Sequence, residues 1–163
     1  MPLKIGGWTL LFHDAFIAQL SSLAAAYLKA KRGDPSGFRA NANTRALAAI
    51  AKLVIEVVPS DPGRQEYRIG NTMGPDYRHW SRVKFGGRFR LFFRYDSKSR
   101  IIVFAWVNDS ETLRKSGSNT DPYTVFKAML KRNDPPDDWA ALRAKAADLP
   151  DDLRATLAQM SND

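Results

Sequence analysis

Hydrophobic positions recur with two different periods along the chain, and the first part predicts one strand and two helices. The short apolar run Trp8–Phe12 predicts a strand, and Asp14 can cap the helix that follows. Apolar residues of that helix recur at steps of three and four: Phe16, Leu20, Leu23 and Tyr27. Gly33 ends this helix, and a second helix is predicted over 38–58, before Pro59.

The middle of the chain has the composition of β-strands. A loop over 60–79 contains three glycines and two prolines, with a short extended piece expected at 67–69. Aromatic and β-branched residues then predict strands over 80–85, 89–95 and 101–107. The last of these is apolar at every position, which predicts a central strand covered on both faces.

Helical periodicity returns in the last part of the chain. Asp121 and Pro122 predict the start of a helix over 123–132, because an acidic cap followed by proline is typical of a helix N-terminus. Two short amphipathic helices are predicted over 137–147 and 151–159.

These elements together predict an α+β class, with a small antiparallel β-sheet, an N-terminal helical pair and extra C-terminal helices. The length of 163 residues suits one domain, 1–163. Within it, 137–163 forms a C-terminal helical extension.

The composition excludes several classes of protein. Hydrophobic residues make up 44% and charged residues 26%, which is typical of a globular chain. There is no cysteine and there are two histidines, so we expect no disulfide, no metal site and no cofactor. The apolar run Ile101–Val107 is too short to span a membrane, and 1–8 lacks the features of an export signal. We therefore expect a cytoplasmic protein with no membrane partner.

The charge is positive and concentrated in one segment. Lysine and arginine total 25 against 17 acidic residues, a net charge of +8. The segment 78–100 has eight cations and one anion, whereas 137–163 has six aspartates and three cations. A basic segment in a folded region favours a polyanionic partner such as a nucleic acid. The alternative is a solvated basic face without function.

The basic segment lies on a predicted hairpin whose parity sorts its side chains onto two faces. A turn at 86–88 pairs Phe85 with Phe89 and Lys84 with Arg90. The core face then holds Val83, Phe85, Phe89, Leu91 and Phe93. The opposite face holds Trp80, Arg82, Lys84, Arg90, Phe92 and Arg94.

The second of these faces has the chemistry of an RNA site. Like charges opposite one another, as at Lys84 and Arg90, destabilise a sheet, which indicates that the cations serve to bind an anion. Trp80 and Phe92 lie between the cations and can stack on bases, as aromatic residues do in single-stranded RNA sites. The alternative is that a helix covers both rings.

The hairpin and the segments after it are similar to a known family. The similarity lies in WSRVKFGGRFRLFFRY (80–95), WVNDSETLR (106–114), DPYTVF (121–126) and MLKR (129–132). These motifs resemble the YhaV family of toxins, within the RelE-like superfamily of type II toxin–antitoxin systems. The resemblance implies a metal-independent endoribonuclease that cuts mRNA, typically on the ribosome. It also implies a cognate antitoxin with a swapped-hairpin (AbrB-like) DNA-binding domain.

Site residues follow partly from this resemblance. A Lys-x-Lys element before the hairpin turn of RelE-like toxins matches Arg82 and Lys84, and an arginine of the next strand matches Arg90. An arginine and a tyrosine after the last strand match Arg114 and Tyr123. Cleavage by the 2′-hydroxyl needs a base, an acid and cations around the phosphorane. We expect the arginines, with Arg94, to bind phosphate, and Lys84 can accept the proton. Arg114 and Tyr123 are expected to flank the scissile phosphate.

Further candidates follow the last strand. Asn108 can contact RNA, and Asp109 or Glu111 can act as base; alternatively, Asp109 caps a helix and Glu111 pairs locally with an arginine. Tyr123, Lys127 and Lys131 share one predicted helical face, which either extends the RNA track or is merely solvated.

Several alternatives remain open at this stage. His13 and His79 could form a catalytic pair, although a structural role for each is favoured. The protein could instead block RNA or the ribosome without catalysis, or inhibit a topoisomerase with a RelE-like fold. An acidic antitoxin segment is expected to cover the basic face, and the alternative is that 137–163 covers it in cis.

Overall fold

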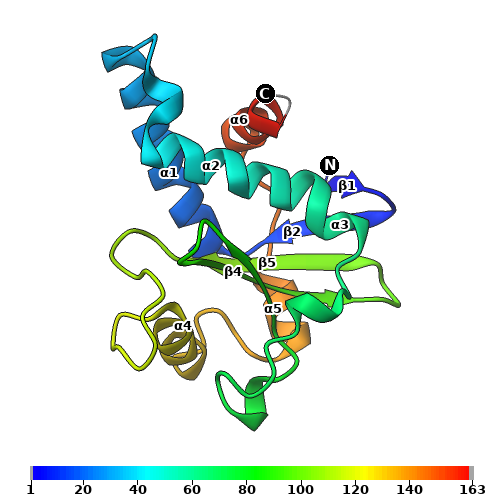
Figure 1. The fold of residues 1–163 in the computed structure, drawn as a ribbon. Coiled ribbons are helices and arrows are strands. Elements are labelled where there is room, and N and C mark those ends of the chain that lie inside the picture. The colour runs from blue at the N-terminus through cyan, green and yellow to red at the C-terminus, as the bar shows by residue number, and fades with distance from the viewer. Residues whose placement is uncertain (1, 162–163) are drawn as a thin grey trace.

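A mixed five-stranded sheet forms the centre of the protein in a computed structural model that describes residues 2–161 (Figure 1). The strand order is β1-β2-β5-β4-β3. The strands are β1 (Leu3–Ile5), β2 (Trp8–Phe12), β3 (Ser81–Phe85), β4 (Phe89–Asp96) and β5 (Ile101–Val107). The α+β class and the central, fully buried position of β5 are confirmed.

The sheet differs from the antiparallel one that we expected, because β2 pairs with β5 in parallel, with Thr9 opposite Ile101. The other three pairs are antiparallel. Strand β1 lies at the edge of the sheet and was not predicted, because three residues with half-buried positions give too short a pattern.

Helices cover both faces of the sheet (Figure 1). On one face lie α1 (Asp14–Gly33), α2 (Ala42–Lys52), α3 (Val58–Ser60) and α6 (Asp151–Ser161). On the other lie α4 (Pro122–Lys131) and α5 (Trp139–Lys145). A π-helical turn, Leu53–Val57, joins α2 to α3, and 3₁₀ turns occur at Phe38–Ala40, Gln65–Tyr67 and Pro75–Tyr77. None of the helices within 2–161 is long and apolar enough to cross a membrane.

The starts of the first two helices differ from the prediction. The N-cap of α1 is His13, whose Nδ1 accepts from the backbone N–H of Ala15, and Asp14 is the first helical residue. The second helix begins at Ala42, because Asn41 caps it and the preceding residues form a separate 3₁₀ turn. Local polar side chains thus shift both helix starts by one to a few residues.

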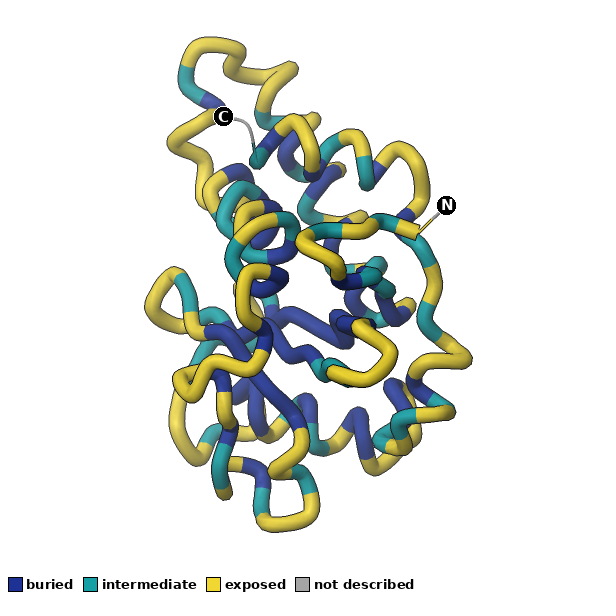
Figure 2. Tube along the Cα trace, turned by 90° about the vertical axis from the view of Figure 1, so that its right-hand side faces the viewer, coloured by how far each residue is buried: buried dark blue, intermediate teal, exposed yellow. Residues whose placement is uncertain are grey.

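Two hydrophobic clusters lie on opposite faces of the sheet, and Figure 2 shows the buried strands between them. The upper core joins α1, α2 and α6 to Val83, Leu91 and Phe93. The lower core joins α4 and α5 to Phe92 and Trp106. The lower core is rich in aromatic rings; Phe92 and Phe126 stack at 4.3 Å between ring centroids.

The C-terminal extension divides between the two cores, with α5 in the lower core and the residues after it in the upper core. Ala147 exchanges two backbone hydrogen bonds with Phe12, and the buried leucines of the extension beyond it, Leu149, Leu153 and Leu157, pack into the upper core. Helix α6 therefore lies on the face of the sheet opposite to Arg82 and Arg90. The alternative in which 137–163 covers the basic face in cis is wrong for α6, because the apolar face of this helix packs on α2. The start of the extension does contact that face, since Asp137 accepts hydrogen bonds from Arg94 and Trp80.

Candidate active site

The β3–β4 hairpin has the register that the sequence predicts. Lys84 lies opposite Arg90, and Phe85 lies opposite Phe89 with their rings stacked. The turn takes its left-handed conformations at Gly86 (φ +55°) and Gly87 (φ +77°). Glycine adopts such angles without strain, so the turn brings the two arginine-bearing strands together at no backbone cost.

Tyr123 is the centre of the candidate site. Its phenol oxygen accepts hydrogen bonds from Arg82 Nε at 2.9 Å and from Arg90 Nε at 3.2 Å. Helix α4 places the ring there because Asp121 caps the helix and accepts from the Tyr123 backbone N–H at 3.1 Å. Two donors occupy both lone pairs of the phenol oxygen, so its own O–H can only donate. No acceptor for this O–H occurs in the part of the chain that the structure describes.

Backbone carbonyls hold the two guanidinium groups in place. Arg82 Nη1 donates to the carbonyls of Glu66 and Arg68, at 3.0 and 2.9 Å. Arg90 Nη1 donates to the carbonyls of Gly87 and Phe89, at 3.1 and 2.8 Å. The two side chains are also only 9% and 7% exposed, so both are fixed before any ligand arrives.

Each of these arginines retains one unused nitrogen. Nη2 of Arg82 and Nη2 of Arg90 have no acceptor among residues 2–161. Thr44 Oγ1 is the one fully buried side-chain nitrogen or oxygen without a hydrogen bond in that range. Both Nη2 groups therefore reach accessible space, where an oxyanion can accept from them.

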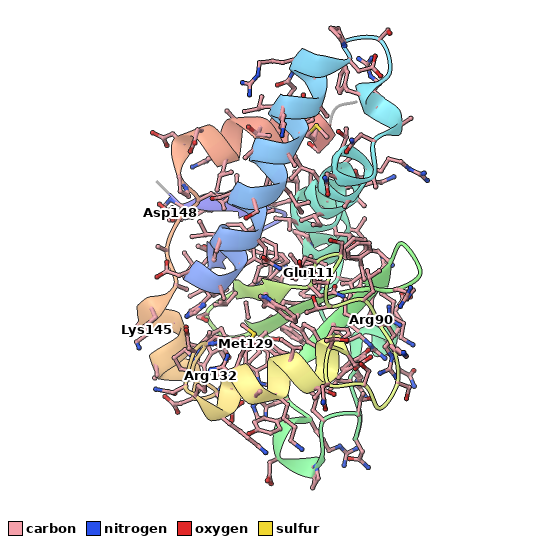
Figure 3. All side chains as sticks on the ribbon, turned by 90° about the vertical axis from the view of Figure 1, so that its left-hand side faces the viewer. Arg90, Glu111, Met129, Arg132, Lys145 and Asp148 are labelled. Atoms are coloured by element: carbon pink, nitrogen blue, oxygen red, sulfur yellow. The ribbon has the colours of Figure 1, made fainter. Side chains whose placement is uncertain are left out.

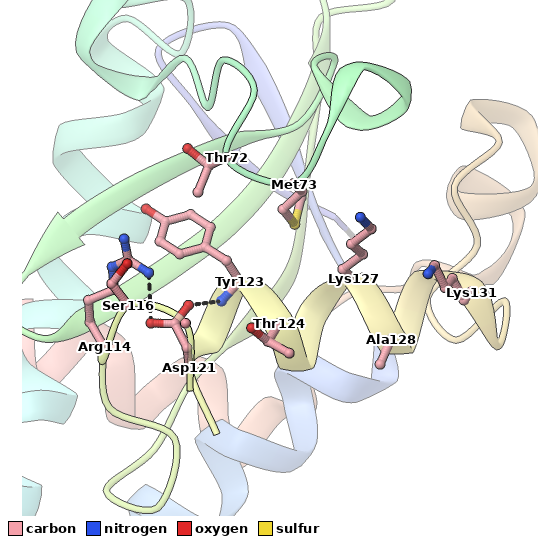
Figure 4. A pocket seen from close by; sticks show the side chains of 11 residues that line it. Thr72, Met73, Arg114, Ser116, Asp121, Tyr123, Thr124, Lys127, Ala128 and Lys131 are labelled. Atoms are coloured by element: carbon pink, nitrogen blue, oxygen red, sulfur yellow. Dashed lines mark hydrogen bonds and ion pairs between the residues drawn. The ribbon is translucent and has the colours of Figure 1, made fainter. Parts of the chain in front are cut away.

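A third arginine, Arg114, contacts the same ring. The Arg114 guanidinium lies over Tyr123, 4.7 Å from the ring centroid, and its Nη1 donates to Asp121 at 2.8 Å (Figure 4). Asp121 also accepts from the Lys115 backbone N–H and is 1% exposed, so both of its carboxylate oxygens already have partners within the protein. Sequence reasoning treated Asp121 only as a helix cap. Its second role, as the ion-pair partner of Arg114, has no local signal.

The structure thus brings together four of the predicted catalytic residues: Arg82, Arg90, Arg114 and Tyr123. The fifth, Lys84, is exposed on β3 opposite Arg90. Lys127 and Lys131 follow Tyr123 along α4, and all three side chains line one cavity. Figure 3 shows α4 running across this face from the neighbourhood of Arg90 toward Arg132.

The two predicted stacking residues do not reach RNA. Trp80 is 1% exposed and Phe92 is fully buried, and both belong to the lower core beneath α4. Their rings contact Phe126, at centroid distances of 5.0 and 4.3 Å. The stacking prediction is wrong, because α4 covers both rings and leaves no face for a base.

Arg94 is also placed away from the site. Its guanidinium lies between the rings of Trp80 and Trp139, 5.4 and 5.5 Å from their centroids, and donates to the backbone carbonyl of Asp137. Burial lowers the pKa of Arg94, and the nearby carboxylates of Asp137 and Asp138 partly offset this. The expected phosphate contact is thus replaced by a contact with the segment before α5.

The polar residues after β5 form a structural turn. Buried Asn108 accepts from the Arg90 backbone N–H at 2.7 Å and donates to the Arg88 carbonyl, so it holds the hairpin and cannot contact RNA. Asp109 accepts from Thr112 and from the Glu111 backbone N–H. Asp109 therefore shapes this turn and caps no helix. The expected pair of Glu111 with Arg114 is also replaced, because Arg114 binds the carboxylate of Asp121.

The two histidines are separate. His13 lies 3.7 Å from Asp134, and burial lowers its pKa, so its neutral form caps α1. His79 Nε2 lies 2.7 Å from Asp137 Oδ1, which also accepts from Trp80. A catalytic pair is wrong, because His13 is buried and caps α1, and each histidine has its own carboxylate partner, Asp134 or Asp137. No group of three metal-ligating side chains occurs within 2–161.

Comparisons with known proteins identify a family that the chain resembles. A family described as a toxin with endonuclease activity, of toxin-antitoxin system, matches residues 10–147. The chain is 42% identical over 143 residues to the Toxin YhaV of Escherichia coli O6:H1. The matched region covers 86% of this chain and 93% of that protein. The same values hold for the Ribonuclease toxin YhaV of Escherichia coli K12. No solved structure matches significantly.

Proposed function

Because the chain belongs to the YhaV family of toxins, which have endonuclease activity, we propose that it cuts messenger RNA by attack of the 2′-hydroxyl on the adjacent phosphorus. This reaction forms a bond from the 2′-oxygen to phosphorus and breaks the bond to the 5′-oxygen. It yields a 2′,3′-cyclic phosphate and a 5′-hydroxyl, and it needs no metal ion.

The observation that carries the proposal is the convergence of Arg82, Arg90 and Arg114 on Tyr123. The free Nη2 groups of Arg82 and Arg90 bind the non-bridging oxygens of the phosphate. Their charge stabilises the phosphorane, because preorganised donors act most strongly where negative charge develops. Arg114 lies beside the same phosphate, held by Asp121.

Proton transfer is assigned from hydrogen-bond capacity. Tyr123 can only donate, so it gives its proton to the leaving 5′-oxygen. Lys84 is the exposed group on β3 opposite Arg90, and we assign it as the acceptor of the 2′-hydroxyl proton because of this position. Asp109 and Glu111 are not assigned this role. The carboxylate of Asp109 already accepts hydrogen bonds from Thr112 and from the Glu111 backbone N–H within its own turn.

The biological setting follows from the family. A toxin–antitoxin system implies an antitoxin that holds the nuclease inactive and an RNA substrate. We propose the cytoplasm as the location, the translating ribosome as the place of cleavage, and an antitoxin with a swapped-hairpin DNA-binding domain. The cationic surface around Lys84 suits an acidic segment of that antitoxin.

A cleavage assay tests the proposal. Purified protein is incubated with RNA in chelator, with and without ribosomes, and the new ends are identified by mass. We expect 2′,3′-cyclic phosphate ends, and a loss of at least about 100-fold in rate for Tyr123→Phe. RNA binding without any cleavage, in both conditions, would instead favour a non-catalytic translation inhibitor.

A further inference from the structure

A cavity of about 520 Å³ opens beside Tyr123 on the exposed side of α4 (Figure 4). Arg114 and Tyr123 form one end, and Lys127 and Lys131 form the α4 wall. Thr72 and Met73 form part of the opposite wall. Ligand pockets commonly have volumes of roughly 300–1,000 Å³, so this cavity is large enough for a nucleotide.

The cavity has an excess of positive charge that the protein does not neutralise. Three cations line it: Arg114, Lys127 and Lys131. Its one carboxylate, Asp121, is already bound to Arg114 and to backbone N–H groups. Neither lysine has an ion-pair partner within the described range 2–161. An anionic ligand is therefore favoured over an apolar or a cationic one.

The spacing of these cations fits a single strand of RNA. Tyr123, Lys127 and Lys131 follow one another at four-residue steps on one face of α4. Four residues of α-helix rise about 6 Å. This is close to the separation of successive phosphates in an extended RNA strand, so the three side chains can follow three consecutive phosphates.

The wall opposite α4 completes the subsite. A Cβ at Gly74 (φ +94°) would lie 3.8 Å from Lys127 Nζ, so this ammonium group reaches across to the 72–74 loop. Met73 is 2% exposed and belongs to the lower core, so it anchors this wall without presenting a face to a base. The Thr72 hydroxyl donates to the Ile69 carbonyl at 2.8 Å and keeps its acceptor capacity, so it can accept from a base amino group.

We propose that this cavity binds the nucleotide next to the scissile phosphate, and that Lys127 and Lys131 bind the two phosphates beyond it. The inference rests on the proposed function, because it takes Tyr123 as the position of the scissile phosphate. It assigns the path of the RNA along α4 and makes the exposed Thr72 a contact of the bound base. An acidic protein segment is the competing occupant, and it is disfavoured because the lysine spacing has a phosphate counterpart.

The test uses binding rather than cleavage, so it does not depend on activity. A single-stranded RNA with 2′-O-methyl groups cannot be cut by 2′-hydroxyl attack, and its affinity is measured over a series of salt concentrations. The variants are Lys127→Ala, Lys131→Ala and the double variant. Exposed Lys52→Ala on α2, on the other face of the sheet, is the matched control.

We expect each variant to lower the slope of log affinity against log salt by about 0.7, and the double variant by about twice that. Lys52→Ala should leave the slope unchanged. The proposal is overturned if the double variant has the slope of the unmodified protein. It is also overturned if the double variant loses binding to the antitoxin while RNA binding is retained, which would assign the cavity to a protein. A protein that binds as expected but never cuts RNA contradicts the proposed function alone.

Discussion

Arg90 and Arg94 lie on one face of β4, two residues on either side of Phe92, but in different environments. At the tyrosine end, Arg82, Arg90 and Arg114 surround Tyr123. At the tryptophan end, Arg94 lies between Trp80 and Trp139, beside Asp137. Both ends combine arginine with aromatic rings on the lower face of the sheet.

The two ends differ in what balances their charge. Asp137 and Asp138 lie close enough to Arg94 to oppose the effect of burial on its pKa. At the tyrosine end the nearest carboxylate, Asp121, serves Arg114, and the spare N–H groups of Arg90 remain open. We therefore expect a substrate contact at the tyrosine end, where the protein supplies fewer acids, and not at the tryptophan end.

The largest expected difference is in catalysis. Arg90→Gln should lower the RNA cleavage rate by at least about 100-fold, because one preorganised donor to the developing charge is lost. Arg94→Gln should stay within about threefold of the unmodified rate, since its guanidinium contacts the protein itself. Cleavage rates of the two variants on one RNA decide this, and equal losses would abolish the distinction between the two ends.

The Arg90→Gln variant also separates charge repulsion from hydrogen bonding in its effect on stability. Lys84 and Arg90 are like charges opposite one another, so repulsion alone would make the removal of either one stabilising. Arg90 makes three side-chain hydrogen bonds in a nearly buried position, so its replacement should instead cost about 1–3 kcal/mol. Lys84→Gln is the matched control, because that side chain is exposed and its removal should not destabilise.

The next largest effect is expected at the tryptophan end. Trp139→Ala removes one of the two rings that hold Arg94, and it should lower the free energy of unfolding by about 2 kcal/mol. The ring is half-buried, so the loss should stay below that of a core tryptophan. Denaturant unfolding measures this loss. RNA cleavage by the folded fraction should be unchanged, and a large catalytic defect would show that the two ends are coupled.

A smaller effect should appear when the charge of the tryptophan end is altered. Asp137→Asn keeps an oxygen for His79 and Trp80 but removes the carboxylate charge. RNA affinity should rise about two- to threefold at low salt, because one negative charge that repels the RNA is removed. The affinity should return to the original value at high salt, because salt screens this charge effect. Unchanged affinity at low salt would show that local acids do not separate the two ends.

The smallest effect concerns pH and lies outside both ends. Burial lowers the pKa of His13 below its ordinary value, against the opposing effect of Asp134 and Asp14. The unfolded chain therefore takes up a proton at a higher pH than the folded chain, and stability falls as the pH drops below about 6.5. His13→Asn keeps a capping oxygen and should reduce this fall. Melting temperatures at pH 7.5 and 5.5 provide the measurement; an identical fall in both proteins contradicts the assignment.

Local patterns predicted strands β2 to β5 and the hairpin register, but not β1. The register of Lys84 opposite Arg90 follows from the period of two and the turn glycines, which are both local. The resemblance to a toxin family indicated Arg114 and Tyr123, and the structure brings both to Arg90.

The remaining errors concern contacts between distant residues. The sequence places Trp80 on the basic face, but only the packing of α4, more than 40 residues later, shows that this face is covered there. The contact of Arg94 with Asp137 likewise joins the hairpin to the start of the C-terminal extension. Neither contact has a periodic signal, because each depends on how helices dock on the sheet.

The parallel pairing of β2 with β5 has a consequence for the order of assembly. Residues 13–100 separate these two strands, whereas β3, β4 and β5 follow one another as a meander. Pairing between distant segments is slow to form, so the edge of β2 that faces away from β1 stays unpaired until β5 has left the ribosome. Tyr123 is made later still. A ribosome that synthesises this toxin therefore meets its completed candidate site only when most of the chain has been made.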